Sequence, residues 1–422
     1  MSGRGCSVSK YGVVELCAGA GGQALGLERA GFDHAIAVEI DPYASATLKA
    51  NRDWRIATGD VADPSVWEPV AFRGTTLLAG GVPCPPFSLA GRQLGANDER
   101  DLFAWSIELI PDLQPRAVML ENVRGLSMPR FAGYRQRVID RLAEFGYRGE
   151  WRLLNASDFG VPQLRPRFVL IALQHDDVPY FHWPQAEPTT ETVGTALRNL
   201  MASNGWVHAD AWAEGASGIA PTIVGGSKKH GGADLGPTRS KQAWGHLGVD
   251  GHGIADRAPA AGDPHPAERR PRLTLEMVQR LQGWDAGSWR FIGPKTAVYR
   301  QVGNAFPAPV ASALGRALIR TFEKVGQPAA TLAADASHSW IYRALRDRVD
   351  YVPLQRLAEL SPHRTPLPSI HTAVEELSRD FIVEVRMTSY GPAYRLGDFR
   401  GFVGQSDHLR QNYLRENRSA VS

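Results

Sequence analysis

The sequence predicts an α/β fold built around an open sheet, and two observations carry this prediction. Residues 11–41 alternate strand, glycine turn, helix and strand, which is the order of a nucleotide-type site. Further along, the apolar run Thr75–Ala79 predicts a buried strand, and the Gly- and Pro-rich segment 80–93 after it is unsuited to helix or strand. That segment holds Cys84 at a strand's carboxyl edge, where open α/β sheets carry out their chemistry.

Composition narrows the class of protein. The chain has 422 residues, enough for two or three domains, and 43% of them are hydrophobic. No apolar run of about 18 residues is present to span a membrane, and the first ten residues lack the apolar core of a signal peptide. The three cysteines predict no disulfide framework, fit a reducing cytoplasm and leave a thiol available. A net charge of +3 neither supports nor excludes nucleic-acid binding. The sequence predicts no metal site.

The N-terminal unit is a candidate ligand site. Tyr11–Cys17 predicts a strand, Ala18–Gly22 a glycine turn, and Gln23–Ala30 a helix. The glycines let the backbone approach a ligand, and the N-terminus of the helix favours negative charge.

An acidic residue follows at the expected place. The second strand, His34–Ile40, ends at Glu39 and Asp41, about 20 residues past the turn, where a carboxylate meets ribose hydroxyls. Because Asp41 precedes Pro42, it is also a typical helix N-cap, so Glu39 is the better ribose ligand. A third unit ends at Asp60.

Two later segments bring charged side chains to the same edge of the sheet. Arg116–Leu120 predicts a strand that delivers Glu121 beside Cys84. In the next alternating segment Arg165 and Arg167 share a face, which suits a phosphate or a pyrimidine carbonyl. The alternatives are a salt-bridge or helix-dipole role for Glu121 and a solvated edge strand for the arginines.

These segments together resemble the DNA cytosine-5 methyltransferases. The matching motifs are Pro83-Cys84 with Phe87-Ser88, the Glu-Asn-Val of 121–123, the Gln-x-Arg-x-Arg of 163–167, Thr222-Ile223, the helix 272–284 and Tyr299–Pro309. The resemblance extends as far as a helix predicted at 310–325. It implies a Rossmann-like class I methyltransferase sheet, S-adenosyl-L-methionine as cofactor and double-stranded DNA as partner.

The resemblance implies a role for each catalytic motif. Cys84 would add to carbon 6 of cytosine and Glu121 would supply a proton at N3. Arg165, with Arg167, would hold the carbonyl O2 and lower the pKa of the thiol. The target base must be flipped out of the duplex, and the polar segment Gly91–Arg100 would close behind it.

The resemblance also implies the cofactor contacts. Glu39 would take the ribose and Asp60 the adenine amino group, whereas Cys17 stands where the family usually has Phe, so an aromatic contact is missing. The expected cofactor-binding residues are Cys17, Ala18, Gly19, Gly21, Gly22, Glu39, Ile40, Asp60, Val61, Pro83, Asn304 and Ala305.

A target-recognition domain is expected at 176–299, inserted into a catalytic domain of 1–175 plus 300–325. Periodicity is poor from His175 to Pro271. The candidate DNA contacts are Ser88, Arg92, Gln93, Thr222, Ile223, Lys228, Lys229 and His230. The alternative for 225–232 is a solvated glycine loop. Arg280 and Gln282, on the family's scaffolding helix, are expected to be structural.

Residues 330–422 lie outside the resemblance and predict a separate small α+β module. Helices are expected at 340–349, 354–360 and 370–377, and strands at 381–387 and 393–396. Three helices and a hairpin suit a winged helix. However, Glu375, Glu376 and Asp380 on the third helix oppose entry into a DNA groove, so a protein-contact or packing role is favoured.

The combined expectation is a cytoplasmic DNA (cytosine-5-)-methyltransferase, a monomer on a specific duplex site, with or without a cognate restriction endonuclease. Two alternatives stay open. An RNA cytosine-5 methyltransferase would use the same chemistry, although the long inserted region argues against it. A non-catalytic DNA-binding regulator could keep the fold, although the intact set of Cys84, Glu121 and Arg165 argues against that.

Overall fold

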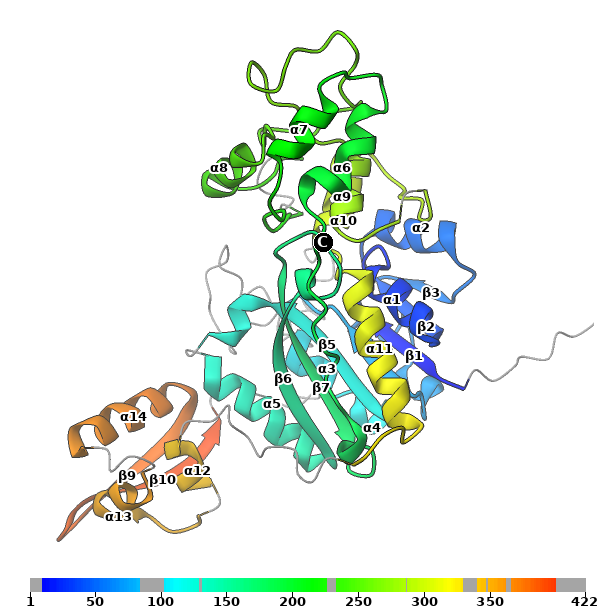
Figure 1. Ribbon diagram of the computed structural model, residues 1–422. Coiled ribbons are helices and arrows are strands. Elements are labelled where there is room, and N and C mark those ends of the chain that lie inside the picture. Colours follow the sequence, from blue (N-terminus) through cyan, green and yellow to red (C-terminus); the bar gives the residue numbers. More distant parts are fainter. Residues whose placement is uncertain are drawn as a thin grey trace, which may run out of the picture.

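The computed structural model in Figure 1 describes residues 10–83, 102–128, 131–225, 233–285, 287–328, 340–346, 348–361 and 366–399. Cys84, the segment Gly91–Arg100 and the candidate DNA contacts Ser88, Arg92, Gln93, Lys228, Lys229 and His230 lie outside the described residues. Within these ranges, every helix is too short or too polar to cross a membrane.

A seven-stranded sheet forms the centre of the large domain. Its strands are β1 (Gly12–Leu16), β2 (Asp33–Glu39), β3 (Ile56–Thr58), β4 (Leu77–Gly80), β5 (Ala117–Val123), β6 (Tyr147–Asn155) and β7 (Pro166–Gln174). They lie in the order β3-β2-β1-β4-β5-β7-β6. The pairs among β1 to β5 are parallel, whereas β7 runs antiparallel to both of its neighbours. The predicted α/β class is therefore confirmed.

Helices cover both faces of this sheet (Figure 1). One face packs against α1 (Gly22–Ala30) and α11 (Ala308–Phe322). The other packs against α3 (Leu102–Ile107), α4 (Ile110–Leu113) and α5 (Ala132–Glu144), while α2 (Pro42–Asn51) contacts β3 and β2 at the sheet's edge. The sequence predicts one helix over 101–113. It is divided because the ring of Pro111 would clash with the carbonyl of Ile107 in a continuous helix.

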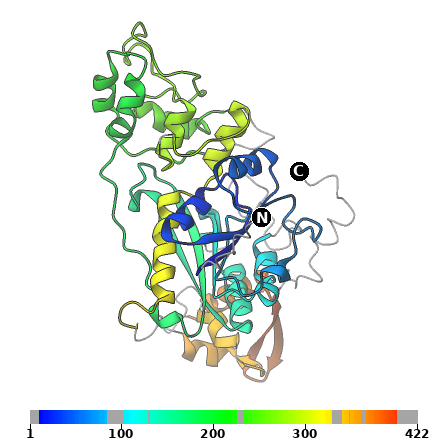
Figure 2. The ribbon, with the colours of Figure 1, turned by 90° about the vertical axis from the view of Figure 1, so that its right-hand side faces the viewer.

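A mostly helical segment follows the sheet and has its own core. It contains α6 (Val193–Ala202), α7 (Ala209–Gly215), α8 (Thr238–His246), α9 (Leu275–Leu281) and α10 (Lys295–Asn304) around Trp212 and Trp244. Thr274 is the N-cap of α9, where its hydroxyl accepts the N–H of Met277. This segment lies over the carboxyl edge of the parallel strands (Figures 1 and 2). The described short 3-10 turns are Pro69–Phe72, Arg124–Ser127, Ala156–Asp158 and Val178–Tyr180.

The C-terminal module forms a second, smaller sheet. Its elements are α12 (Trp340–Arg346), β8 (Val352–Pro353), α13 (Leu354–Leu360), α14 (Leu367–Asp380), β9 (Phe381–Thr388) and β10 (Gly391–Phe399), with strand order β8-β10-β9. The three predicted helices and the predicted strand pair are confirmed. Ile341, Leu357 and Ile370 belong to a core separate from that of the large sheet.

Polar contacts to Asp140 help to join this module to the large domain. The hydroxyl of Tyr342 donates to Asp140 on α5, and Arg346 Nη1 lies 3.7 Å from Asp140 Oδ1. Burial and the hydrogen bond to Asp140 raise the pKa of Tyr342. The module thus lies at the end of the molecule away from α6–α8 (Figure 1).

We expect a chain ending at Pro328 to fold. Removing the C-terminal module exposes a polar contact surface on α5, and the core beneath the large sheet stays covered. Losing one such hydrogen bond should cost about 1 kcal/mol. In a thermal unfolding scan the transition of the large domain should move by no more than about 4 °C. Aggregation of the shortened chain, or loss of a cooperative transition, would show that the two cores depend on each other.

Candidate active site

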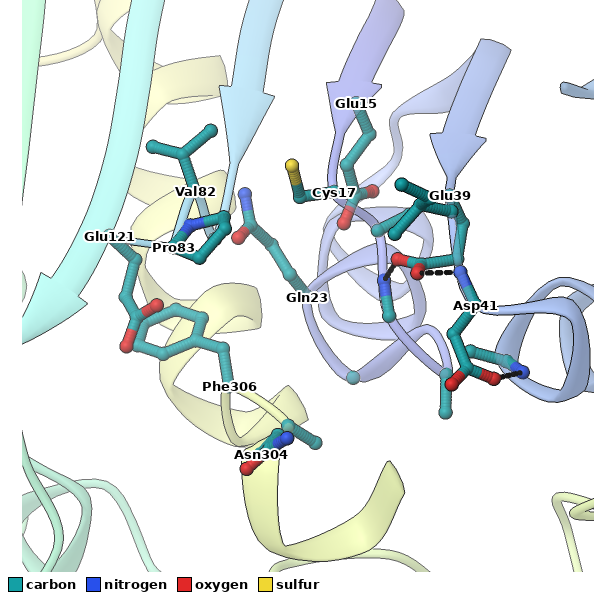
Figure 3. Close-up of a pocket in the computed structure, with 18 of the residues that line it drawn as sticks. Glu15, Cys17, Gln23, Glu39, Asp41, Val82, Pro83, Glu121, Asn304 and Phe306 are labelled. Carbon is teal, nitrogen blue, oxygen red and sulfur yellow. Dashed lines mark hydrogen bonds between the residues drawn. The ribbon is translucent and has the colours of Figure 1, made fainter. Parts of the chain in front are cut away.

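A cavity of about 500 Å³ opens at the carboxyl edge of the sheet (Figure 3). The ends of β1, β2, β4 and β5 surround it, and the α10–α11 junction forms its remaining wall. Every predicted cofactor-binding residue other than Gly21 lines this cavity. Strands and turns far apart in the sequence therefore meet where the sequence analysis expected.

Gly21 has a different function from the one expected. It caps α1 with φ of 93°, and a Cβ there would lie 2.7 Å from the ring of Trp289. Glycine is thus required by the backbone conformation and by close packing. Gly22 allows the α10–α11 junction to approach closely in the cavity wall. A Cβ added at Gly22 would lie 2.3 Å from the carbonyl oxygen of Phe306.

Glu39 is held at one end of the cavity by two backbone groups. Its Oε2 accepts the N–H of Gly19 at 2.6 Å, and its Oε1 accepts the N–H of Asp41 at 2.7 Å. Each carboxylate oxygen keeps a further lone pair for a ligand hydroxyl. Burial raises the pKa of Glu39, against the opposing effect of these backbone hydrogen bonds.

The predicted division of labour between the two acidic residues is consistent with this geometry. Asp41 accepts the N–H groups of Tyr43 at 2.9 Å and Ala44 at 3.1 Å, so its predicted capping role is confirmed. Asp60 also lines the cavity, where its Oδ1 accepts the N–H of Ala62 at 2.9 Å.

The other end of the cavity carries an ion pair. Arg167 Nε lies 2.5 Å from Glu121 Oε1, and both side chains are almost buried. Burial raises the pKa of Glu121, although Arg167 and Arg165 oppose the shift. Since β4 pairs with β5, Glu121 meets the start of the glycine- and proline-rich segment, and a Cβ on Gly81 would lie 3.3 Å from Glu121 Oε2.

Arg165 does not line the cavity, which corrects its expected role as the main pyrimidine ligand. Its guanidinium donates to the carbonyl of Ile223 at 2.7 Å, of Gly303 at 2.6 Å and of Ala305 at 3.0 Å. The side chain is 1% exposed. Arg165 therefore connects the sheet to the helical segment and to the α10–α11 junction, and Arg167 is the arginine that faces Glu121.

The expected DNA contact at Ile223 also needs correction, whereas the one at Thr222 stays a prediction. Ile223 is fully buried, and its N–H donates to Gln163 Oε1 at 2.9 Å. The hydroxyl of Thr222 donates to the carbonyl of Leu164 at 2.5 Å. This dipeptide fastens the helical segment to the loop before β7, so the side chain of Ile223 cannot reach DNA.

The structural role expected of Arg280 and Gln282 is confirmed. Gln163 Nε2 donates to Gln282 Oε1 at 2.6 Å, and Gln282 Nε2 donates to the carbonyl of Val302 at 2.6 Å. Arg280 forms an ion pair with Glu191.

Two polar residues of the cavity were missed from the sequence. Gln23 is 3% exposed, and neither end of its amide has a partner among the described residues. Glu15 Oε2 lies 2.6 Å from His34 Nε2, while its Oε1 is unpaired in the described structure. A glutamate inside the apolar strand 12–16 was the available signal. Since buried polar groups are normally satisfied, these atoms indicate a ligand with polar groups of its own.

We predict that Arg165→Met will destabilise the fold strongly. The substitution leaves three buried carbonyls without their charged donor, at a cost of about 3 kcal/mol or more. Arg320→Met, on the exposed side of α11, is the matched control and should change stability by about 0.5 kcal/mol at most. Urea unfolding measures the stability of both variants. Equal unfolding midpoints would contradict the role of Arg165 in connecting the sheet to the helical segment.

Comparisons with known proteins agree with this geometry. Residues 11–320 match the model of the C-5 cytosine-specific DNA methylase family. The chain is 55% identical over 411 residues to the Type II methyltransferase M.NaeI of Lentzea aerocolonigenes, covering 97% of this chain and 99% of that protein. It is 47% identical over 318 residues to the Type II methyltransferase M.NgoMIV of Neisseria gonorrhoeae, covering 74% and 98% respectively.

The fold has a solved counterpart. A crystal structure of a Spodoptera frugiperda DNMT2 mutant matches with a TM-score of 0.52 and 18% identity over 74% of this chain and all of that one. The family match covers the sheet, the cavity and the helical segment. The chain belongs to the C-5 cytosine-specific DNA methylase family.

Proposed function

We propose that this DNA (cytosine-5-)-methyltransferase modifies one specific double-stranded site through a covalent Cys84 adduct on a flipped-out base. The observation that carries the proposal is the single cavity with two chemically different ends. Glu39 stands at one end, the Glu121–Arg167 pair at the other, and Gln23 between them (Figure 3). A cavity of this kind can hold two reactants next to each other, as a transfer between them requires.

The chain's residues fit the family's cofactor. Glu39 would accept the ribose hydroxyls and Asp60 the adenine amino group, while Asn304 and Ala305 close the wall opposite the turn. The unpaired atoms of Glu15 and Gln23 suit the charged amino-acid end. S-adenosyl-L-methionine, when bound, supplies an electrophilic methyl group. Cys17 lines the cavity in place of the family's usual aromatic residue.

The other end of the cavity would activate the base. Cytosine carbon 5 is a poor nucleophile, and addition of the Cys84 thiolate at carbon 6 gives it enamine character. N3 must gain a proton in that step, and Glu121, whose pKa is raised by burial, would donate it. Arg167, rather than Arg165, would hold the carbonyl O2, because only Arg167 reaches the cavity. Once carbon 5 has taken the methyl group, its proton would pass to solvent and the proton on N3 would return to Glu121. The carbon 5–carbon 6 double bond then re-forms as the bond to Cys84 breaks and the thiolate leaves.

The domain organisation supports duplex recognition. The strand order supports a Rossmann-like class I methyltransferase sheet, and residues 1–175 plus 300–325 would form the catalytic domain around it. Residues 176–299 would form the target-recognition domain. Arg167 and Glu121 face the cavity beneath it, so a base must leave the duplex to reach them. The segment Gly91–Arg100 would close behind that base.

DNA contacts and cellular setting remain proposals. Ser88, Arg92, Gln93, Thr222, Lys228, Lys229 and His230 keep their proposed DNA contacts, while Ile223 takes the fastening role instead. One chain would act on each target base, as a monomer on the DNA in the cytoplasm. The names of the two relatives support a place in a type II restriction-modification system.

The C-terminal module would be a winged helix that contacts protein rather than DNA. Its order, helix-strand-helix-helix-strand-strand, and its β8-β10-β9 sheet support that fold. Glu375 is exposed on α14, which opposes entry into a groove. The Neisseria relative matches 74% of this chain over 98% of its own length, which supports a catalytic unit without this module.

Glu39→Ala should weaken cofactor binding by about 1.5–3 kcal/mol, or about 10- to 150-fold in Kd, because charge-assisted hydrogen bonds are lost. Asp41→Ala is the control, since loss of the α2 cap should cost about 1 kcal/mol of folding stability with little change in cofactor affinity. Isothermal titration calorimetry distinguishes them. Equal affinity for the wild type and Glu39→Ala would assign the ribose to another group.

Cys84→Ser should abolish methyl transfer while the fold and cofactor affinity persist, because the hydroxyl is a much weaker nucleophile than a thiolate. Transfer of tritium from labelled cofactor to a DNA duplex and to tRNA measures the activity and separates the DNA from the RNA alternative. The wild type should form a covalent complex with 5-fluorocytosine DNA, and the variant should not. Substantial turnover by Cys84→Ser would reject the assignment.

A further inference from the structure

We propose that the C-terminal module joins two copies of this chain through antiparallel pairing of their β9 strands. In the three-stranded sheet β10 lies in the middle and β9 at one edge. Pairing two such edges would produce one six-stranded sheet around a two-fold axis. The proposal concerns a surface remote from the cavity and goes beyond the proposed function.

Among the described residues, the outer backbone edge of β9 has no partner strand. Met387 pairs with Pro392, which has no N–H, so this pair cannot exchange both backbone hydrogen bonds. The residue pairs that exchange both backbone hydrogen bonds are therefore Arg386 with Ala393 and Glu384 with Arg395. By this alternation Val383, Val385 and Met387 direct their N–H and C=O groups away from β10.

The side chains along this edge are unusually apolar for an unpaired strand. Val385 is 57% exposed and Met387 is 74% exposed. Exposed edge strands are normally protected by Lys, Pro or a bulge, but residues 383–388 contain no Lys or Pro and keep a regular register with β10. The outer edge of β9 is therefore suited to pairing with another strand.

The order of charges on β9 selects a second copy as that partner. In an antiparallel pair centred on Val385, Val383 lies opposite Met387 of the other copy. Glu384 then lies directly opposite Arg386 of the other copy, and the reverse pair forms on the far side of the axis. Arg386 is exposed and has no carboxylate partner among the described residues.

The sheet already holds Glu384 in place for this contact. The carboxylate accepts from the Tyr351 hydroxyl at 2.6 Å and from Arg395 Nη2 at 2.6 Å. Because the same register aligns the free backbone groups, the apolar residues and both charge pairs, the strand is complementary to itself. A single strand pair buries little area, so we expect a transient dimer.

The position of the module leaves catalysis independent of the dimer. It packs on α5, away from the helical segment that covers the cavity (Figure 1). Two copies joined at β9 would keep both cavities open, so one chain can still act on each base.

Cross-linking of the full chain tests the register. In Val385→Cys the two thiols would face each other across the axis, so mild oxidation should give a covalent dimer. Val349→Cys is the matched control, because Val349 is 84% exposed on the same module but away from β9. The wild type, with its native cysteines, sets the background. Equal dimer yields for Val385→Cys and Val349→Cys would overturn the proposal.

Sedimentation velocity tests the association without oxidation. The wild type should show concentration-dependent dimerisation, and Arg386→Glu should raise its Kd about tenfold by placing like charges opposite each other. Val385→Pro should abolish the dimer. It removes an outward N–H and no hydrogen bond to β10, so the melting temperature and methyl transfer should stay close to those of the wild type.

Three results would contradict the proposal. One is a wild type that stays monomeric at every concentration, and another is a dimer that Val385→Pro and Arg386→Glu leave unchanged. The third is a chain ending at Arg400 that dimerises when the full chain does not, which would show that the chain's own last residues cover this edge.

Discussion

The architecture depends on one buried guanidinium. Arg165 donates to carbonyls at Ile223, Gly303 and Ala305, which belong to segments far apart in the sequence. These bonds satisfy Nη1 and Nη2 of the buried charge, whereas Arg165 Nε has no partner among the described residues. By holding these two segments, 223 and 303–305, at the start of β7, Arg165 fixes the helical segment over the sheet and the α10–α11 junction in the cavity wall.

The chemical properties of the cavity depend on the burial of its charged side chains. Glu121 and Arg167 lie at the closed end of the cavity, where desolvation raises the pKa of the carboxyl against the attraction of the arginine. Glu39 lies at the other end on two backbone donors. The sheet brings these groups together because parallel strands end at one edge. The sheet therefore holds two carboxyl groups, those of Glu121 and Glu39, at opposite ends of one cavity.

The sequence predicted what depends on local pattern. Strand ends located Glu39, Asp60 and Glu121, and the Asp-Pro pair identified the cap at Asp41. Local pattern failed at Arg165, because alternation between faces applies only within a strand and β7 begins at Pro166. It also failed at Ile223, whose partners lie 58 and 60 residues away.

Other features were invisible for the same reason. The strand β8 has two residues, too few for a periodic signal, and exists only because β10 pairs with it. The packing of Gly21 on Trp289 joins residues far apart in the sequence. Motifs therefore identify which residues gather, while tertiary contacts decide which arginine lines the cavity.

The most direct test of that last distinction is a crystal structure of the chain with S-adenosylhomocysteine and a duplex that carries 5-fluorocytosine. The account predicts Arg167 within hydrogen-bond distance of O2 and Glu121 beside N3 of the flipped base. Arg165 should keep its three carbonyl partners. A complex in which Arg165 leaves those carbonyls and contacts the pyrimidine would contradict it.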